Sequence, residues 1–482
     1  MIVPVPDVIP PARQLGKVHF VGLGGYGLSG IARLMIAEGV TVSGSDKQDS
    51  KYLHALADLG ATTYVGHDAE HLGDADTLVV STAIREENPE VVAARERGLL
   101  ILPRSAALRS VMLGRRVLAV TGTHGKTTAT SMLTVMLQHV GADPSYAIGG
   151  SLLSTGVNAG LGTGPDFVAE ADESDGSFLV YRAFGAVVTN IDSDHLDFWG
   201  TEEAYRSSYV DFLDTFEPGG FLVVGNDDPG AAHLGDVAEA KGIRTIRVGF
   251  DESSELRAVD PVYEGMTSSF DVVRAGERLG RVTLRIPGHH YVVDALCALA
   301  CGMEIGHPFD ALVGGLEEYT GTARRLEPKG EEAGIRVFDT YAHHHLEIQG
   351  DLEAARVVAG EGRLIACYQP NPLNRLRYFY REMGESLTPA DVVVVLDVDP
   401  GRDDPDPAIT GQLVVDHVGE GPELVIYEPD RERAAAVLAD VARPGDMVLT
   451  LGSGNVTTVG PELLALLRRR VDSSEPGAEE SQ

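Results

Sequence analysis

The stretch RRVLAVTGTHGKTT, residues 115–128, decides the fold class of this chain. Its first half is an apolar run typical of a buried β-strand, and its second half is a glycine-containing turn that leads into a helical pattern. A strand that passes through such a turn into a helix is the building unit of a parallel sheet covered by helices. The stretch therefore predicts an α/β fold.

The turn itself has the composition of a phosphate-binding loop. Backbone N–H groups can cradle phosphates there, Lys126 can neutralise the β and γ oxygens, and Thr127 can ligate Mg²⁺. Val120 stands at the first glycine position of the strict G-x-x-x-x-G-K-[ST] pattern, but the physical requirements are met. We therefore predict that this segment binds ATP, through Gly122, Thr123, His124, Gly125, Lys126, Thr127 and Thr128.

The alternation of strands and helices continues on both sides of this turn. Strand patterns occur upstream in KVHFVGLGG and VTVSGSD, and downstream in IRVFDTYA, RLIACYQP and DVVVVLDVD. The segment 255–288 alternates more strictly, which indicates an antiparallel insertion. With 482 residues the chain is long enough for about three domains. We predict an N-terminal Rossmann-like domain (1–113), a central P-loop ATP-binding domain (114–322), a C-terminal Rossmann-like domain (323–470) and a disordered tail (471–482).

The overall composition excludes several classes of partner. The formal net charge of −33 opposes binding to nucleic acid and to anionic membranes. No run of about 18 apolar residues is present, and the N-terminus lacks the pattern of a signal peptide. The three cysteines form no C-x-x-C pair, which fits a reducing compartment. We therefore expect a cytoplasmic protein, a monomer or homodimer, that acts on small molecules.

A second glycine-rich turn lies near the N-terminus, in GLGGYGLSG. The spacing Gly22-x-Gly24-x-x-Gly27 fits the dinucleotide fingerprint, and Asp46 ends the next strand about twenty residues later. Glycines let the backbone approach a pyrophosphate, which the N-terminus of the following helix attracts. The motif does not identify the nucleotide, because a nicotinamide oxidoreductase would use the same turn.

Two acidic segments follow strands of the predicted central domain. AEADESD (169–175) contains Glu173, and TNIDSDHLD (189–197) contains His195. Carboxylates at a strand end suit Mg²⁺, although a solvated acidic loop is the alternative in so acidic a chain. A histidine beside a Mg²⁺–phosphate site can ligate a second metal or contact the transferring phosphoryl group.

Three consecutive histidines, residues 343–345, occur in FDTYAHHHLEIQ. On a strand only the outer two share a face, and on a helix neighbouring residues fan around the axis. Zinc needs three or four converging ligands, so the triplet cannot close a metal site alone.

Several segments, in their order along the chain, resemble the Mur ligases of peptidoglycan synthesis. They are GLGGYGLSGIA, GTHGKTT, EADESDGSF, TNIDSDHLD, PGHHYVVDALCALA, RRLE and DTYAHHHLE. The resemblance covers about residues 18–464 and implies a UDP-sugar domain, an ATPase domain and an amino-acid domain. It implies that ATP phosphorylates a substrate carboxylate and that an amine attacks the acyl phosphate, giving an amide, ADP and phosphate. The segment 199–216 has no lysine, which is typical of the alanine-adding branch, whose substrates are UDP-N-acetylmuramate and L-alanine.

The resemblance also implies roles for individual residues. The implied catalytic residues are Lys126, Glu173, His195 and Arg325. The implied ligands of Mg²⁺ are Thr127, Glu173 and His195. ATP would further contact His290, Asp294, Arg325 and Asp339. The UDP-linked substrate would contact Gly22, Gly24, Gly25, Gly27, Ser45 and Asp46, so that the first turn holds UDP rather than NAD. The acceptor or amine would contact Tyr341, His343, His344, Asn371 and Arg375.

The chain departs from the family pattern mainly in its C-terminal third. His345 stands at a proline position, Asn371 at a histidine position, and Asp294 at an asparagine position. Asparagine cannot carry the charge that histidine can, and an ionised aspartate offers no donor. Three interpretations remain open. The enzyme could have an altered acceptor or amine specificity, or the changes could be neutral drift in an ordinary alanine-adding enzyme. The protein could also be an inactive nucleotide-binding scaffold.

Overall fold

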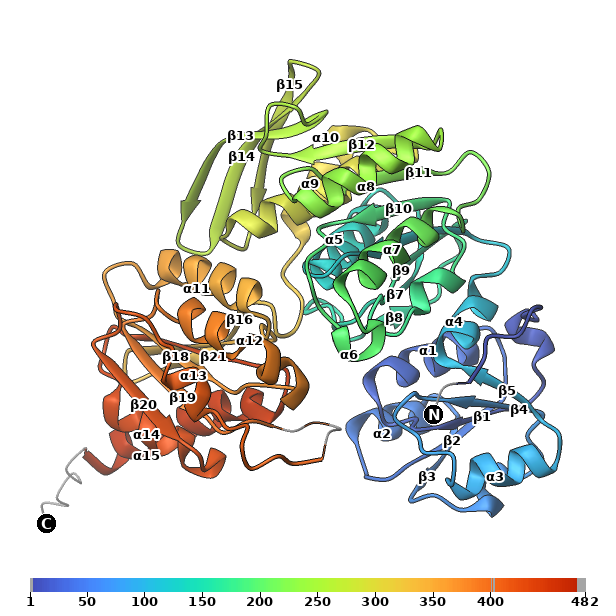
Figure 1. The fold of residues 1–482 in the computed structure, drawn as a ribbon, viewed down its shortest axis with the longest axis horizontal. Helices are drawn as coiled ribbons and strands as arrows, with labels where there is room; N and C mark the ends of the chain where they lie inside the picture. The colour runs from blue at the N-terminus through green and yellow to red at the C-terminus, as the bar shows by residue number, and fades with distance from the viewer. Residues whose placement is uncertain (1–2, 400, 402–403, 475–482) are drawn as a thin grey trace, which may run out of the picture. The chain divides into compact units, whose positions relative to one another are not determined.

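The computed structural model describes residues 3–399, 401 and 404–474, and its strands form three sheets (Figure 1). The chain divides into two compact units, which we describe separately. The first unit comprises residues 1–259, 271–282 and 293–320. The second comprises residues 260–270, 283–292 and 321–482.

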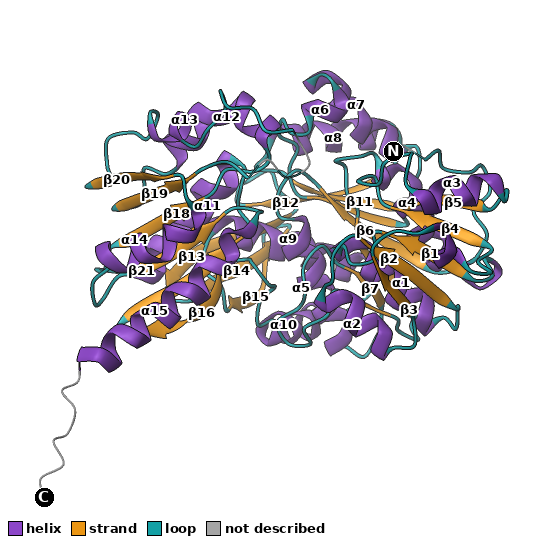
Figure 2. Cartoon of the chain, turned by 90° about the horizontal axis from the view of Figure 1, so that it is seen from below, coloured by secondary structure: helices purple, strands orange, loops and turns teal. Residues whose placement is uncertain are grey.

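The first sheet has five parallel strands in the order β3-β2-β1-β4-β5. The strands are β1 (Val18–Val21), β2 (Val42–Asp46), β3 (Thr62–Val65), β4 (Thr77–Val80) and β5 (Leu100–Pro103). The helices are η1 (Ala12–Gln14), α1 (Tyr26–Ala37), α2 (Lys51–Asp58), η2 (Ala69–Leu72), α3 (Pro89–Glu96) and α4 (Arg104–Met112). Every residue of β1 is buried, because right-handed crossovers place α1 and α2 on one face and α3 on the other (Figure 2). The strand order reverses between β1 and β4, which is where doubly wound sheets bind ligands.

The second sheet has ten strands in the order β15-β14-β13-β12-β11-β10-β6-β9-β7-β8. Its core strands are β6 (Arg116–Thr121), β7 (Ser145–Ala147), β8 (Ala159–Gly160), β9 (Asp166–Glu170), β10 (Gly185–Val188), β11 (Phe221–Gly225) and β12 (Arg244–Gly249). The helices are α5 (Lys126–His139), η3 (Ser177–Val180), α6 (Leu196–Trp199), α7 (Glu202–Leu213), α8 (Pro229–Ala240), α9 (His289–Glu304) and α10 (Phe309–Glu318). The central strands pair in parallel, so the ends of β6, β9 and β10 meet at one edge.

The predicted antiparallel insertion is present as the three remaining strands of this sheet. They are β13 (Leu256–Glu264), β14 (Thr267–Arg274) and β15 (Glu277–Leu284). Only two residues separate each strand from the next, and connections that short join antiparallel neighbours.

The third sheet lies in the second unit, in the order β16-β17-β21-β18-β19-β20. Its strands are β16 (Glu327–Glu332), β17 (Ile335–Thr340), β18 (Leu364–Tyr368), β19 (Val392–Leu396), β20 (Leu424–Glu428) and β21 (Met447–Leu451). Its helices are α11 (His345–Ala359), α12 (Leu373–Ser386), α13 (Gln412–Val415), η4 (Arg431–Arg433), α14 (Ala434–Val441), η5 (Asn455–Thr458) and α15 (Val459–Ser474). Only β16 pairs antiparallel, with β17.

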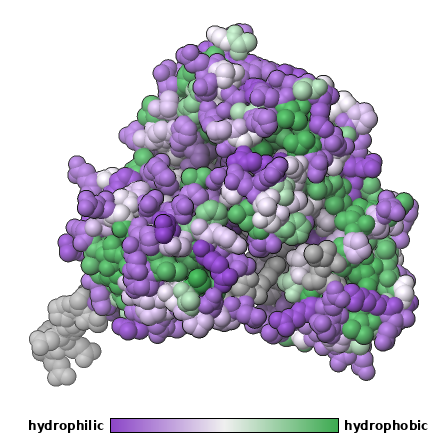
Figure 3. Space-filling model, in the orientation of Figure 1, coloured by the Kyte–Doolittle hydropathy of each residue, from purple (hydrophilic) through white to green (hydrophobic). Residues whose placement is uncertain are grey.

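The predicted disordered tail begins too early. Residues 471–474 belong to helix α15, and residues 475–482 lie outside the described part of the chain. Hydrophilic residues cover much of the face in Figure 3, in keeping with the acidic composition. Among the described residues, we find no helix with the length and apolar character needed to cross a membrane.

Candidate active site

The predicted phosphate loop joins β6 to α5, as the sequence indicated. Gly125 caps α5 with a left-handed backbone (φ 81°), and Lys126 is the first helical residue. Gly122 has φ 130°, and a Cβ atom there would lie 2.2 Å from Oγ1 of Thr189 on the neighbouring strand connection. Only glycine therefore fits at residue 122, where the loop passes close to its neighbour.

Lys126 is held inside this loop. Its Nζ atom donates to the carbonyl oxygens of Gly122 (2.7 Å) and Thr123 (3.0 Å) and to Oε1 of Glu173 (3.0 Å). Burial alone would lower the pKa of Lys126, but the nearby carboxylates, with Glu173 foremost, raise it above its ordinary value. The lysine is therefore charged and fixed at the position where a phosphate would bind.

The acidic segment after β9 surrounds this lysine. Glu173 is fully buried, and burial raises its pKa to about 8 against the opposing attraction of Lys126. Glu170 accepts from Oγ1 of Thr127 (3.1 Å) and from the backbone N–H of Gly149 (2.6 Å). Glu170 belongs to the acidic cluster seen in the sequence, but the prediction did not include it among the metal ligands.

His195 follows β10 and reaches the same carboxylate. Its backbone is left-handed (φ 53°), and its Nε2 atom lies 3.4 Å from Oδ2 of Asp194 and 3.7 Å from Oε1 of Glu173. The indole of Trp199 donates to the backbone oxygen of Glu173 (3.1 Å). The hydroxyl of Thr127 and the carboxylates of Glu170 and Glu173 are the hard oxygen donors that fit Mg²⁺.

A residue that the sequence prediction missed supports the loop from β10. The side-chain oxygen of Asn190 accepts from the backbone N–H of His124 (2.8 Å), and its amide nitrogen donates back to the oxygen of His124 (3.1 Å). The signal was its place two residues after the end of the strand, in the sequence TNIDSDH.

The first glycine-rich turn joins β1 to α1. The backbone N–H groups of Gly22 and Leu23 donate to the oxygen of Ser45 (2.9 Å each), and Gly24 N–H donates to Oδ2 of Asp46 (2.9 Å). Asp46 therefore fixes the turn in this structure. The side chain of Ser45 is fully buried and donates to Glu90 (2.6 Å), and its contact with a UDP group stays a prediction.

The predicted adenine residues fall in different compact units. Asp294 belongs to the first unit and is 3% exposed, and its Oδ1 atom lies 2.2 Å from where a Cβ on Gly125 would stand. It therefore adjoins the phosphate loop. In the second unit His290 contacts Asp351 (3.2 Å), which also accepts from the hydroxyl of Tyr291 (2.9 Å).

Asp339 and the arginines before it form one network in the second unit. Buried Asp339 accepts from the hydroxyls of Thr450 and Thr457 (2.7 Å each) and from Nε of Arg324 (3.1 Å). These bonds hold the Asp339 carboxylate in place between three donors, and its contact with ATP stays a prediction. The guanidinium of Arg325 lies 5.2 Å from the ring centre of Tyr341.

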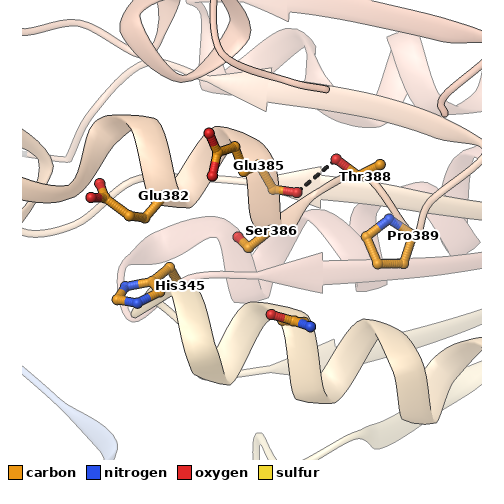
Figure 4. A pocket seen from close by; sticks show the side chains of 7 residues that line it. His345, Glu382, Glu385, Ser386, Thr388 and Pro389 are labelled. Carbon is orange, nitrogen blue, oxygen red and sulfur yellow. Dashed lines mark hydrogen bonds between the residues drawn. The ribbon is translucent and has the colours of Figure 1, made fainter. Parts of the chain in front are cut away.

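The three histidines lie in three different environments. The ring of His343 contacts the backbone oxygen of Tyr341 (3.0 Å). His344 is 1% exposed and caps helix α11, and its role as a substrate contact stays a prediction. The ring of His345 stacks on that of Phe379. His345 also lines a cavity of about 290 Å³ (Figure 4). The other residues that line this cavity are Gln349, Glu382, Glu385, Ser386, Thr388 and Pro389.

Asn371 and Arg375 lie together at the start of α12. The side chain of Asn371 accepts from the hydroxyl of Ser453 (2.6 Å) and donates to the backbone oxygen of Asp399 (3.1 Å). Arg375 is 7% exposed and donates to the oxygen of Asn371 (3.4 Å). The structure thus brings these two predicted substrate residues into one loop cluster.

Comparison with known proteins identifies the family. Residues 17–116 match the model "Mur ligase family, catalytic domain", residues 120–302 the "Mur ligase middle domain", and residues 324–454 the "Mur ligase, glutamate ligase domain". This chain belongs to the Mur ligase family. The comparisons confirm the predicted family and its three α/β domains, while the domain boundaries stay predictions.

Individual Mur ligases align with nearly the whole chain. The UDP-N-acetylmuramate–L-alanine ligase of Nocardioides sp. is 56% identical over 467 residues, which cover 97% of this chain and 100% of that protein. The ligase of the same name from Thermobifida fusca is 46% identical and covers 94% of this chain and 97% of its own length. The crystal structure of UDP-N-acetylmuramate-alanine ligase from Thermotoga maritima has a TM-score of 0.80 at 26% identity, covering 95% of this chain and 100% of that one.

Proposed function

We propose that this Mur ligase joins the carboxylate of UDP-N-acetylmuramate to the amine of L-alanine, with conversion of ATP to ADP and phosphate. The charged Lys126, buried against Glu173 in the phosphate loop, is the observation that carries the proposal. The substrates follow from the names of relatives that align over nearly the full chain. The proposal places the reaction in the cytoplasm and leaves the protein a monomer or homodimer.

Positioning and charge neutralisation supply most of the catalysis in this proposal. A carboxylate is a poor electrophile at neutral pH, and phosphorylation gives it a leaving group. Lys126 is held by the oxygens of Gly122 and Thr123, so its ammonium group need not reorganise when a phosphoryl group is transferred. The backbone N–H groups at the start of α5 point to the same place.

A divalent cation would be held on the acidic side of the loop. Thr127, Glu173 and His195 are the proposed ligands, and Glu170 is close enough to Thr127 to support them. Mg²⁺ bound there would neutralise negative charge on the ATP phosphates. Lys126 provides a positive charge that Glu173 contacts directly.

The first glycine-rich turn is the proposed site for the UDP group. The N-terminus of α1 follows Gly25, and the start of a helix attracts the negative charge of phosphate groups. Lys126 and the acidic metal segment have no role in nicotinamide chemistry, so a hydride-transfer function is not favoured. A ligase for a different amine is the second candidate, because Asn371 and His345 replace family residues in the substrate loops.

The test is ADP release from the purified protein with Mg²⁺ and ATP. UDP-N-acetylmuramate is present or absent, and each amino acid is added singly. We expect release only with both the sugar nucleotide and L-alanine. Release with another amine instead supports the second candidate. Absence of release with every combination contradicts both.

A further inference from the structure

Arg104 lies where the first and second sheets of the first unit approach each other. It directly follows β5 and begins helix α4. Helix α4 contacts η3. Helix α1 contacts β8 (Figure 1). Arg104 lies close both to the first glycine-rich turn, at Gly27, and to the acidic metal segment, at Asp172.

The head of Arg104 is bound to the acidic segment. Its Nη2 atom donates to Oδ2 of Asp172 (2.8 Å) and lies 3.6 Å from Oδ2 of Asp175. The carboxylates on either side of Glu173 are therefore both within reach of one guanidinium. Asp172 raises the pKa of Arg104, against the effect of burial, and Arg104 in turn lowers the pKa of Asp172.

The stem of Arg104 lies against the first turn. A Cβ atom on Gly27 would stand 3.5 Å from both Cδ and Nη1 of Arg104. Gly27 is the second residue of helix α1, whose N-terminus attracts phosphate. Arginine has five N–H donors in a fixed fork, so Nη1 can face an anion at this helix end while Nη2 keeps its bond to Asp172.

Other contacts fix the two sides against each other. The hydroxyl of Tyr26 bonds to that of Ser151 (2.8 Å), and Nδ2 of Asn158 donates to the oxygen of Tyr26 (3.3 Å). Further along α4, Arg109 donates to the oxygen of Tyr181 (2.9 Å). These contacts join the two sides in addition to Arg104, which supplies a charged link through its bond to Asp172.

We propose that Arg104 is a positioning residue that joins the UDP site to the metal site: it contacts the pyrophosphate at the N-terminus of α1 and anchors Asp172, which fixes Glu173 beside Lys126. This inference rests on the proposed function. It predicts that the sugar nucleotide and Mg²⁺ each favour the binding of the other through this one side chain.

Calorimetric titration of UDP-N-acetylmuramate tests the first half. We expect Arg104→Gln to weaken binding roughly 10- to 100-fold, the range for loss of charge-assisted hydrogen bonds, and Arg104→Lys to recover part of the loss. Asp172→Asn should leave the affinity within about twofold, because it removes only the anchor on the other side. Arg95→Gln, at a surface arginine of α3 that lies beside Glu86, is the control and should bind like the wild type.

The Mg²⁺ dependence of ADP release tests the second half. Both Arg104→Gln and Asp172→Asn should raise the Mg²⁺ concentration for half-maximal activity several-fold, and the double variant should raise it no further, since the two act as one unit. Additive effects in the double variant would overturn the anchoring role. If Arg104→Gln does not unfold cooperatively, Arg104→Lys is measured in its place. The affinity for UDP-N-acetylmuramate and the Mg²⁺ concentration for half-maximal activity should then change in the same directions, by smaller amounts.

The two proposals fail in different ways. Wild-type protein that does not bind UDP-N-acetylmuramate contradicts the proposed function. Wild-type binding together with unchanged affinity in Arg104→Gln contradicts only the role of Arg104. Equal losses of affinity in Arg104→Gln and Asp172→Asn would mean that the pair merely supports the interface, and would also overturn the proposal.

Discussion

The Nζ atom of Lys126 lies 3.0 Å from Oε1 of Glu173, although 47 residues separate them in the chain. Lys126 belongs to the phosphate loop after β6, and Glu173 belongs to the acidic segment after the neighbouring strand β9. Parallel pairing of these strands brings both side chains to one edge of the sheet. The pair joins the proposed ATP site to the proposed metal site.

Replacing Lys126 with methionine should remove ligase activity while keeping the fold. The lysine stabilises charge on the transferring phosphoryl group, and removing one such preorganised donor typically costs about 10²–10³ in kcat. Steady-state ADP release measures the loss. Lys241→Met, at a half-exposed lysine paired with Asp214, is the control and should retain activity. Full activity of the Lys126 variant would contradict the assignment of the loop.

Gly122→Ala should destabilise the protein by about 2 kcal/mol or more, because the new Cβ would clash with Thr189 at 2.2 Å and residue 122 has φ 130°. The free energy of unfolding from urea titration gives the value. Gly141→Ala is the matched control, since it shares a positive φ (74°) but has no atom within 4 Å of the added Cβ. Equal losses in the free energy of unfolding for Gly122→Ala and Gly141→Ala would show that the positive φ angle causes the loss and that the clash with Thr189 does not.

Glu90 should contribute stability that depends on pH. It is fully buried on α3 and accepts from Ser45 (2.6 Å), His71 (3.1 Å) and the N–H of Asp68 (3.3 Å). Burial would raise its pKa, but the nearby His19, whose Nε2 atom lies 3.8 Å from the carboxylate, and the hydrogen bond from Ser45 outweigh burial and lower it. A carboxyl group with a lowered folded pKa stabilises the protein above its unfolded pKa, and the contribution is lost as the pH falls through the folded pKa.

We therefore expect Glu90→Gln to reduce the free energy of unfolding by about 1–3 kcal/mol at pH 7, and by less near pH 4. Urea unfolding at both pH values measures the difference between wild type and variant. Glu96→Gln, at an exposed residue of the same helix, should have little effect at either pH. A loss for Glu90→Gln that grows on acidification would be opposite in sign to the prediction.

The three cysteines should be inert in the folded protein. Cys297, Cys301 and Cys367 are all buried, and burial raises the pKa of Cys367 to about 12. Thiol reagents attack the thiolate, so we expect no labelling by iodoacetamide at pH 8 before unfolding and complete labelling in urea. Mass spectrometry counts the modified residues. Rapid labelling of any native thiol would contradict its burial.

The local patterns in the sequence predicted most of the fold. A buried strand, a glycine turn and a helix are specified by neighbouring residues, so GLGGYGLSG and GTHGKTT could be placed correctly on β1–α1 and β6–α5. The alternation in residues 255–288 likewise predicted the hairpin strands. The end of α15 was misplaced, because helices fray gradually and composition marks their ends poorly.

By itself, then, the sequence determined the order of strands, turns and helices, the phosphate loop and the family, since each depends on residues close together in the chain. Only the tertiary structure decided that Ser45 faces Glu90, that Asp339 is occupied by Thr450 and Thr457, and that Arg104 reaches Asp172. These partners lie 45 or more residues apart, and strand order and register determine which side chains meet. A sequence motif identifies candidate residues of a site, but the packing of the sheets determines which side chains contact them.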